Sequence, residues 1–385
     1  MKPWLCQLLL GLSMAVAATA QSYDSRIWIP VKINDQPVRF IFDTGATGTI
    51  LFQHTAARLH LDSTPLPQSA DVVPGNIAHL LTEPVKFTLL GKEFTDLKLA
   101  IAPDPPGPSN EIDGVIGWPN LSANNFLFTG ANLEINLLHL APDNLSSWPE
   151  FAEKSDHQVL SLRFPLDLSG QPAYLGVDTG SPHGLRLEHS ALEAWRKAHR
   201  NAPTTLNAYY TPGSGLVVSE EIWVPEFDLH GLKLNHIPMG PMNPTEQHLY
   251  PPGTLAVIGL QGLRRLDLFH DSKNQIAHIN PIFTPAPPYP HNMIGAVFTP
   301  ENLSADSLLA HVVKGSPAYK AGVREGDVLI KINEMDVTSW RTTPGILPLS
   351  RFFYQPPGTV LHLTLKRGDK TFVAKVTLRT ILGPG

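Results

Sequence analysis

The sequence has almost no cysteine and few charges, and each shortage excludes a class of protein. Cys6 is the only cysteine among 385 residues, so the chain cannot be a disulfide-stapled scaffold. Charged residues make up 16% of the chain, and no basic run or stripe occurs. With a net charge of −5, these features argue against nucleic-acid binding. The 16 histidines show no metal-ligand spacing, and we expect neither a metal nor another cofactor.

Long apolar runs are absent except near the N-terminus. Residues 1–20 contain one lysine, an apolar run from Leu8 to Ala17 and then small residues, a pattern typical of a secretory signal cleaved after Ala20. A membrane anchor is the alternative, but the run is short of the roughly 20 residues that span a bilayer. Cys6 precedes the run, so the processed chain would lack cysteine. We therefore expect an exported protein, periplasmic or extracellular, without a stable membrane span after signal removal.

Proline, in contrast, is abundant. The chain has 37 prolines, a hydrophobic fraction of 42% and no long stretch of helical periodicity. Short runs of β-forming residues alternate with turn residues along most of its length. This combination predicts a mainly β fold with many turns, and the length suggests two or three domains.

One short pattern occurs twice. An apolar run ends in Asp43–Ala46 in the first copy and in Asp178–Ser181 in the second, and both read Asp-Thr-Gly followed by a small residue. A hairpin precedes each copy, and an apolar segment closed by glycine follows each at a similar distance, at Val115–Gly117 and Ala256–Gly259. Such shared order indicates an internal repeat on the scale of a whole domain.

On these segments the chain resembles the aspartic proteases, both pepsin-like and retroviral. The resemblance implies two pseudo-symmetric β-barrel lobes in which Asp43 and Asp178 form the catalytic pair. The residues it implies for support of the active-site loops are Thr44, Gly45, Thr179, Gly180 and Ser181. The residues in the position of a flap over the substrate cleft are Pro74, Gly75, Tyr210 and Gly213.

The C-terminal tail resembles a PDZ domain of the bacterial type, a small α+β fold. The motifs that carry this resemblance are Gly315–Ala318 and Ala321–Val328. By resemblance, backbone N–H groups of a loop would capture the terminal carboxylate of a polypeptide. The residues of this loop are Ile294, Gly295, Ala296 and Val297. A docking module with an unoccupied groove is the alternative.

These patterns divide the chain into five segments. They are a signal peptide at 1–20, an N-terminal protease lobe at 21–147, a C-terminal lobe at 148–282, a proline-rich linker at 283–291 and the PDZ domain at 292–385.

Two carboxyl groups about 3 Å apart share one proton, so one can activate water while the other polarises a carbonyl group. We therefore expect an aspartic endopeptidase that acts on polypeptides as a monomer. Ala46 and Ser181 differ, which predicts unequal surroundings for the two carboxyl groups. His183 lies close to Asp178 in sequence, and we expect it on a surface loop.

Four other interpretations stay open. The aspartates could merely cap turns or form a decayed, non-catalytic pair. The protein could be an exported adaptor that holds peptides in the same cleft and PDZ groove. It could also self-associate and combine lobes from two chains.

Overall fold

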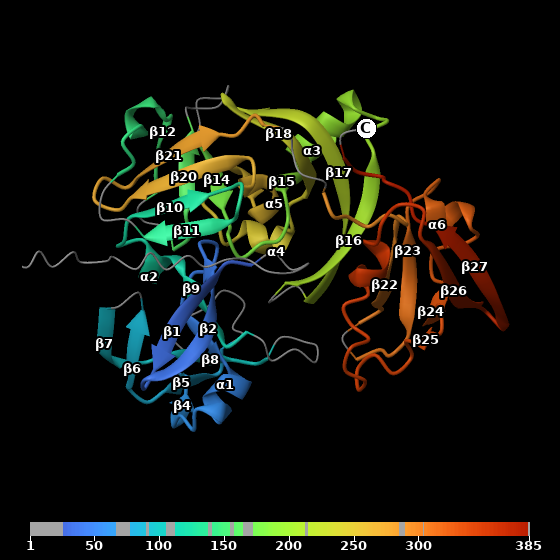
Figure 1. Ribbon diagram of the computed structural model, residues 1–385, viewed down its shortest axis with the longest axis horizontal. Helices are drawn as coiled ribbons and strands as arrows, with labels where there is room; N and C mark the ends of the chain where they lie inside the picture. Colours follow the sequence, from blue (N-terminus) through green and yellow to red (C-terminus); the bar gives the residue numbers. More distant parts are fainter. Residues whose placement is uncertain are drawn as a thin grey trace, which may run out of the picture.

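The computed structural model describes residues 26–66, 78–89, 92–104, 112–137, 141–154, 158–164, 172–211, 215–284, 289–302 and 304–383. The fold is mainly β, as the sequence predicts, with sheets of nine, five, seven and six strands in these residues (Figure 1). The expected signal peptide lies outside the described residues.

The nine-stranded sheet belongs to the first lobe. Its strand order is β4-β5-β8-β3-β9-β2-β1-β6-β7. The strands are β1 (Trp28–Ile33), β2 (Gln36–Asp43), β3 (Ile50–Phe52), β4 (Ser63–Pro65), β5 (Leu80–Thr82), β6 (Val85–Leu89), β7 (Lys92–Leu97), β8 (Ala100–Ala102) and β9 (Gly114–Gly117). Two short helices follow strands of this sheet: α1 (Gln53–Arg58) and α2 (Trp118–Leu121).

The seven-stranded sheet belongs to the second lobe. Its strand order is β13-β14-β19-β15-β18-β17-β16. The strands are β13 (Ser161–Phe164), β14 (Ala173–Val177), β15 (Leu185–Leu187), β16 (Thr204–Thr211), β17 (Gly215–Leu229), β18 (Leu232–Pro241) and β19 (Thr254–Ile258). Three helices accompany it: α3 (His189–Ala198), α4 (Pro244–Gln247) and α5 (Leu260–Leu263).

The centres of these two sheets have the same topology. β2 runs parallel to β9, and β9 is antiparallel to β3, which is parallel to β8. In the second lobe β14 runs parallel to β19, and β19 is antiparallel to β15, which is parallel to β18. The repeat visible in the sequence is therefore a repeat of chain path, and it ends β2 and β14 at equivalent places.

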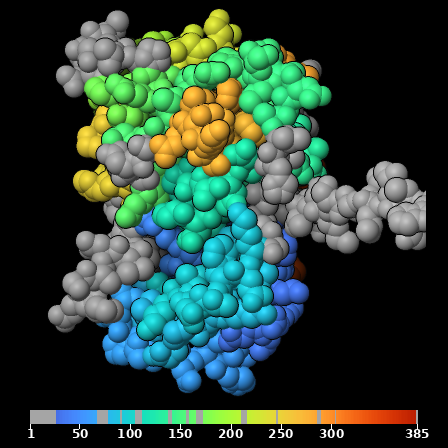
Figure 2. Space-filling model, turned by 90° about the vertical axis from the view of Figure 1, so that its left-hand side faces the viewer, coloured from blue at the N-terminus to red at the C-terminus, as the bar shows by residue number. Residues whose placement is uncertain are grey.

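A five-stranded sheet joins the lobes. Its order is β11-β10-β20-β21-β12, so strands that follow the first lobe pair with strands that follow the second. Figure 2 shows the orange residues around 270 between green residues of this earlier segment. The elements are β10 (Phe126–Thr129), β11 (Glu134–Leu137), the 3-10 helix η1 (Leu145–Ser147), β12 (Glu150–Ala152), β20 (Leu266–Asp271) and β21 (Ile276–Pro281).

The prediction that each lobe is a closed β-barrel is wrong. Among the described strands no sheet closes on itself, because β4 and β7 remain the two ends of the first-lobe sheet, and β13 and β16 the ends of the second. β10 and β11, which follow the first lobe, pair with each other, and β10 pairs with β20 of the shared sheet instead of closing a barrel. The lobes are open sheets over one common core.

That common core ties the shared sheet to the strand that carries Asp43. Buried apolar residues of both lobes form one cluster. Within it Phe42 packs edge-to-face on Phe126 of β10, with ring centroids 5.5 Å apart. Trp118 packs on the same phenylalanine at 6.3 Å. Burial of aromatic side chains is a large stabilising contribution, and here it fixes the end of β2.

The tail has its own core and a separate six-stranded sheet. Its elements are β22 (Ala296–Pro300), β23 (Leu308–Val312), α6 (Pro317–Lys320), β24 (Val328–Ile332), β25 (Met335–Asp336), α7 (Ser350–Phe353), β26 (Val360–Arg367) and β27 (Lys370–Thr377). The tail lies beside β16 and β17 of the second lobe (Figure 1). No helix in the described part of the chain is long and apolar enough to cross a membrane.

Asp113 joins three elements of the first lobe just before β9. Its carboxylate accepts hydrogen bonds from the Arg39 N–H at 2.7 Å, from the Thr55 hydroxyl at 2.8 Å and from the Arg58 guanidinium. Burial opposes ionisation of Asp113, but these donors prevail and lower the pKa of its carboxyl. The charge therefore holds β2, α1 and β9 together.

We expect Asp113→Ala to lower the free energy of unfolding by about 3 kcal/mol, because buried donors lose a charged acceptor. Urea unfolding at pH 7 measures the loss. Asp62→Ala, at an exposed position of the same lobe, is the control. Equal losses in the two variants would contradict this role for Asp113.

Candidate active site

The two Asp-Thr-Gly loops meet at the junction of the lobes. Asp43 ends β2, and Asp178 directly follows β14. Both side chains are half-buried. A Cβ atom placed on Gly45 would lie 2.5 Å from Cγ of Asp178, and one on Gly180 would lie 2.3 Å from Cγ of Asp43. Each glycine thus allows the opposite carboxyl group to approach, and the two carboxyl groups lie together within one chain.

The two threonines hold the loops to each other. The Thr44 hydroxyl donates to the carbonyl oxygen of Val177 at 2.6 Å and accepts from the Thr179 N–H at 3.1 Å. The Thr179 hydroxyl donates to the carbonyl oxygen of Phe42 at 2.8 Å and accepts from the Thr44 N–H at 3.0 Å. Both threonines are buried. Four hydrogen bonds therefore cross the junction, and the threonines that make them directly follow Asp43 and Asp178 in sequence.

The apolar segments that end in glycine pack behind the loops. The N–H of Trp118, just after β9, donates to the carbonyl oxygen of Ala46 at 2.9 Å. The N–H of Leu260, just after β19, donates to the carbonyl oxygen of Ser181 at 2.8 Å. Equivalent bonds at equivalent positions fix the far end of each loop.

The two carboxyl groups have unequal donors. Oδ1 of Asp43 accepts from the Gly45 N–H at 2.8 Å. Oδ1 of Asp178 accepts from the N–H groups of Gly180 and Ser181 at 3.0 and 2.9 Å. Oδ2 of Asp178 also accepts from the Tyr250 hydroxyl at 3.1 Å. Asp178 therefore has more donors to stabilise its charged form.

The pKa values of the pair follow this difference. Burial and the neighbouring Asp178 raise the pKa of Asp43 well above its usual range. Burial also raises the pKa of Asp178, but the Tyr250 hydroxyl and the charge of Arg186 act against it. The pair therefore favours a proton on Asp43 and the negative charge on Asp178.

Tyr250 was not found by sequence reasoning. It is buried and lies between α4 and β19, far from either Asp-Thr-Gly loop in sequence. A Cβ atom on Gly176 would lie 2.4 Å from the Tyr250 ring. Glycine inside an apolar strand signals close approach of another group, so Gly176 was the available clue.

Arg186 was also missed, and His183 was misplaced. Arg186 is buried, its guanidinium lies over the Tyr209 ring at 4.3 Å, and it donates to the Tyr209 hydroxyl. His183 is 8% exposed and packs on Tyr209, with ring centroids 4.2 Å apart. The expectation of a surface loop for His183 is therefore wrong, and burial beside Arg186 lowers the pKa of its imidazole well below the usual range.

The predicted flap residues are only partly described. Pro74, Gly75 and Gly213 lie outside the described residues. Tyr210 lies near the end of β16, whose partner is β17. The described residues contain no group of three or more His, Cys, Asp or Glu side chains that could hold a metal ion.

The predicted carboxylate-binding loop of the tail is occupied from within. Oδ1 of Asn292 accepts from the N–H groups of Ile294 and Gly295 at 3.1 and 3.2 Å. Its Nδ2 donates to the carbonyl oxygens of Ala296 at 2.7 Å and of Leu206 in β16 at 3.0 Å. The loop and β22 are buried through Val297 and beyond. The structure therefore places these four predicted residues together, but uses two of their N–H donors internally.

Two family models match parts of the chain. The model described as "Aspartyl protease" matches residues 29–119, and the one described as "PDZ domain" matches residues 310–367. The chain therefore carries an aspartyl protease domain and a PDZ domain, and both resemblances drawn from the sequence are confirmed. The protease match includes Asp43 and ends before Asp178.

Comparison with individual proteins gives two further similarities. Serine protease HTRA1 of Xenopus tropicalis is 33% identical over 82 residues, which are 21% of this chain and 16% of that protein. The chain thus spans a small part of that relative. The crystal structure of an aspartic proteinase from Irpex lacteus has a TM-score of 0.44 at 12% identity, covering 70% of this chain and 98% of the other.

Asp43→Asn is expected to raise the melting temperature near pH 7 and to change it less near pH 4. The raised pKa of Asp43 means that the folded protein keeps a proton that the unfolded chain loses above about pH 4, so stability falls as pH rises. Asparagine cannot ionise, so this pH-dependent loss of stability is absent from the variant, while the side-chain oxygen still accepts from the Gly45 N–H. Thermal unfolding at both pH values should show a gain of roughly 2–4 °C at pH 7.

Glu226→Gln, at an exposed carboxyl of β17, serves as the control and should leave the melting temperature unchanged at both pH values. A loss of stability in Asp43→Asn at pH 7 would show that the carboxyl is not held in its neutral form.

Proposed function

We propose that the protein is an exported aspartic endopeptidase in which Asp43 and Asp178 activate a water molecule to hydrolyse peptide bonds. The observation that carries the proposal is the contact of two carboxyl groups across two interlocked loops. An aspartyl protease domain in the first lobe supports the same chemistry. The equivalent chain path of the second lobe supplies the partner carboxyl group.

The unequal surroundings assign the roles. Asp178, with more donors and the Arg186 charge nearby, is the carboxylate that takes a proton from the water. Asp43 holds the proton and donates it to the carbonyl oxygen of the substrate, which becomes more polarised. The water attacks the carbonyl carbon directly, so no covalent bond to the protein forms. The C–N bond of the tetrahedral species then breaks as Asp178 gives its proton to the leaving nitrogen, and one hydroxyl of that species returns its proton to Asp43.

The tail is proposed to capture polypeptides for the cleft. Capture of a free C-terminus at the loop Ile294–Val297 requires the peptide carboxylate to displace the Asn292 side chain from two N–H groups. This exchange keeps both N–H groups bonded and replaces a neutral acceptor by a charged one, which binds more strongly. Export, a periplasmic or extracellular location and a monomeric state belong to the same proposal and rest on the sequence.

We expect Asp43→Asn and Asp178→Asn each to lower the rate of casein cleavage by at least about 1,000-fold, because each removes one half of the acid–base pair. Cleavage is measured across pH 3 to 8, and the wild type should be most active below neutral pH. Glu226→Gln, which alters an exposed carboxyl, should retain wild-type rates. Wild-type protein that binds casein without cleaving it would favour the adaptor interpretation.

Tyr250→Phe is expected to move the acidic limb of the kcat/KM profile to higher pH by about one unit, because a hydrogen bond to a charged group contributes roughly 1.5–3 kcal/mol. The groups that face Asp178 are Tyr250, Arg186 and Asp43, together with two backbone N–H groups. Loss of the phenol raises the pKa of Asp178, so a higher pH is needed to ionise it.

Tyr174→Phe, which removes a hydroxyl from buried β14 of the same sheet, is the matched control and should leave the limb in place. An unshifted profile in Tyr250→Phe, with activity otherwise normal, would contradict the positioning role of Tyr250.

A further inference from the structure

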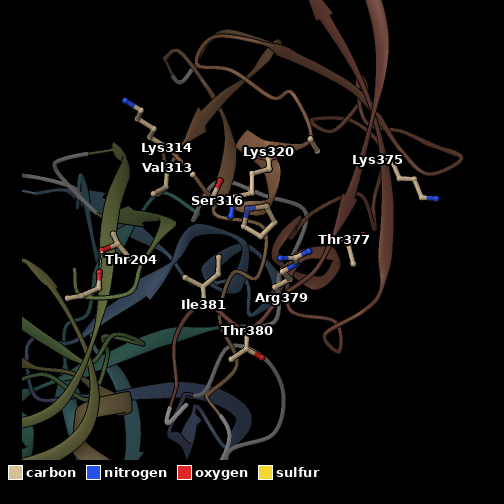
Figure 3. Close-up of a pocket in the computed structure, with 14 residues that line it drawn as sticks. Thr204, Val313, Lys314, Ser316, Lys320, Lys375, Thr377, Arg379, Thr380 and Ile381 are labelled. Carbon is tan, nitrogen blue, oxygen red and sulfur yellow. Dashed lines mark hydrogen bonds between the residues drawn. The ribbon is translucent and has the colours of Figure 1, made fainter. Parts of the chain in front are cut away.

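A cavity of about 630 Å³ lies between the second lobe and the tail. The second lobe contributes Ala202 and Thr204, at the start of β16. The tail contributes residues of two segments, 313–321 and 375–381 (Figure 3). This volume lies in the range of about 300–1,000 Å³ that is usual for ligand sites.

The charge around this cavity has one sign. Its lining includes Lys314, Lys320, Lys375 and Arg379, and it includes no acidic residue. All four basic side chains are exposed, and none forms an ion pair with another described residue. In a chain with a net charge of −5, four cations gathered without a counter-charge favour an anionic ligand.

The other arginines of the tail differ from Arg379. Arg341 pairs with Asp306 and Arg367 with Asp327. Arg324 donates to two backbone carbonyl oxygens, and Arg351 lies over the Phe352 ring. These four have structural partners, whereas the part of the chain that the structure describes supplies none for the guanidinium of Arg379.

The lining is suited to an extended ligand. Figure 3 shows Arg379 near the middle of the cavity, below Lys320 and beside Ile381, with Lys314 and Lys375 at opposite sides. The lining also includes apolar and hydroxyl side chains: Val313, Pro317, Ala321, Ile381, Thr204, Thr377 and Thr380. Charges spread over such a mixed surface match a chain with repeated carboxylates better than a compact anion.

The cavity adjoins the loop that Asn292 occupies. Gly295 has φ of +66°, and a Cβ atom there would lie 2.4 Å from Cβ of Ser316 and 3.4 Å from Ile381, two residues of the cavity lining. The N–H donors of the loop are engaged, and β22 is buried beside β16. The cavity is thus an open surface beside a loop whose N–H donors are already engaged by Asn292.

We propose that this cavity binds an acidic stretch of polypeptide through Lys320 and Arg379, with Lys314 and Lys375 at its two ends. The site reads side-chain carboxylates and does not require a free C-terminus. Binding at this site does not depend on hydrolysis by Asp43 and Asp178, so the two proposals can be tested independently of each other.

The test is fluorescence anisotropy of labelled deca-glutamate, amidated at its C-terminus, with the full chain at pH 7 and low salt. We expect saturable binding that weakens as salt rises, and no binding of deca-glutamine of the same length. The double variant Lys320→Glu/Arg379→Glu should bind at least about tenfold more weakly, a change of roughly 1.4 kcal/mol. The control Lys366→Glu/Lys370→Glu changes the net charge equally at exposed positions of β26 and β27 outside the cavity, and should bind within about twofold of the wild type.

Several outcomes would overturn the proposal. They are no saturable binding by the wild type, equal weakening in both double variants, and binding only of a peptide with a free C-terminus that is indifferent to Lys320→Glu/Arg379→Glu. Failure to bind deca-glutamate, together with retention on phosphatidylglycerol vesicles that the same double variant loses, would assign the cavity to a membrane surface instead. Thermal unfolding of both double variants checks that their folds match the wild type.

Discussion

The position of the two carboxyl groups depends on the hydrogen bonds that Thr44 and Thr179 exchange. Each hydroxyl donates a hydrogen bond to a carbonyl oxygen of the opposite strand and accepts one from a backbone N–H of the opposite loop. Without either hydroxyl, a buried N–H and a buried carbonyl would lose their partners, at a cost of about 1–3 kcal/mol for each group. The contact between Asp43 and Asp178 is therefore a property of both lobes together.

Duplication supplied a symmetric frame, and the second lobe then broke the symmetry. The backbone bonds behind the loops are equivalent at Ala46 and Ser181. Tyr250 donates to Asp178, and the charge of Arg186 also stabilises the charged form of Asp178. A symmetric pair would have no preferred site for its single proton, whereas this one does. The fold thus provides two similar carboxyl groups, and two side chains outside the repeated motif make them different.

The sequence predicts the parts of this site that depend on local pattern. A strand that ends in Asp-Thr-Gly, repeated in the same order, was sufficient to identify both loops. The β character of the fold was predicted from abundant proline, short β-forming runs and the lack of helical periodicity. Tyr250 and Arg186 could not be predicted, because they reach Asp178 through tertiary packing that no short motif encodes. The difference between Ala46 and Ser181 suggested unequal surroundings, but Ser181 contributes a backbone N–H, which any residue except proline could supply. In the tail, the pattern located the loop Ile294–Val297 and could not reveal that Asn292 fills it.

The shared sheet sets the order in which the molecule can be completed during synthesis. β10 and β11 are synthesised early, yet β10 gains its partner on the side opposite β11 only when β20 follows. Phe42, next to Asp43, packs on Phe126 of β10. A nascent chain that stalls after the first lobe consequently lacks both the second carboxyl group and the strand β20 that pairs with β10. An unfinished copy therefore lacks the paired carboxyl groups that define the candidate active site.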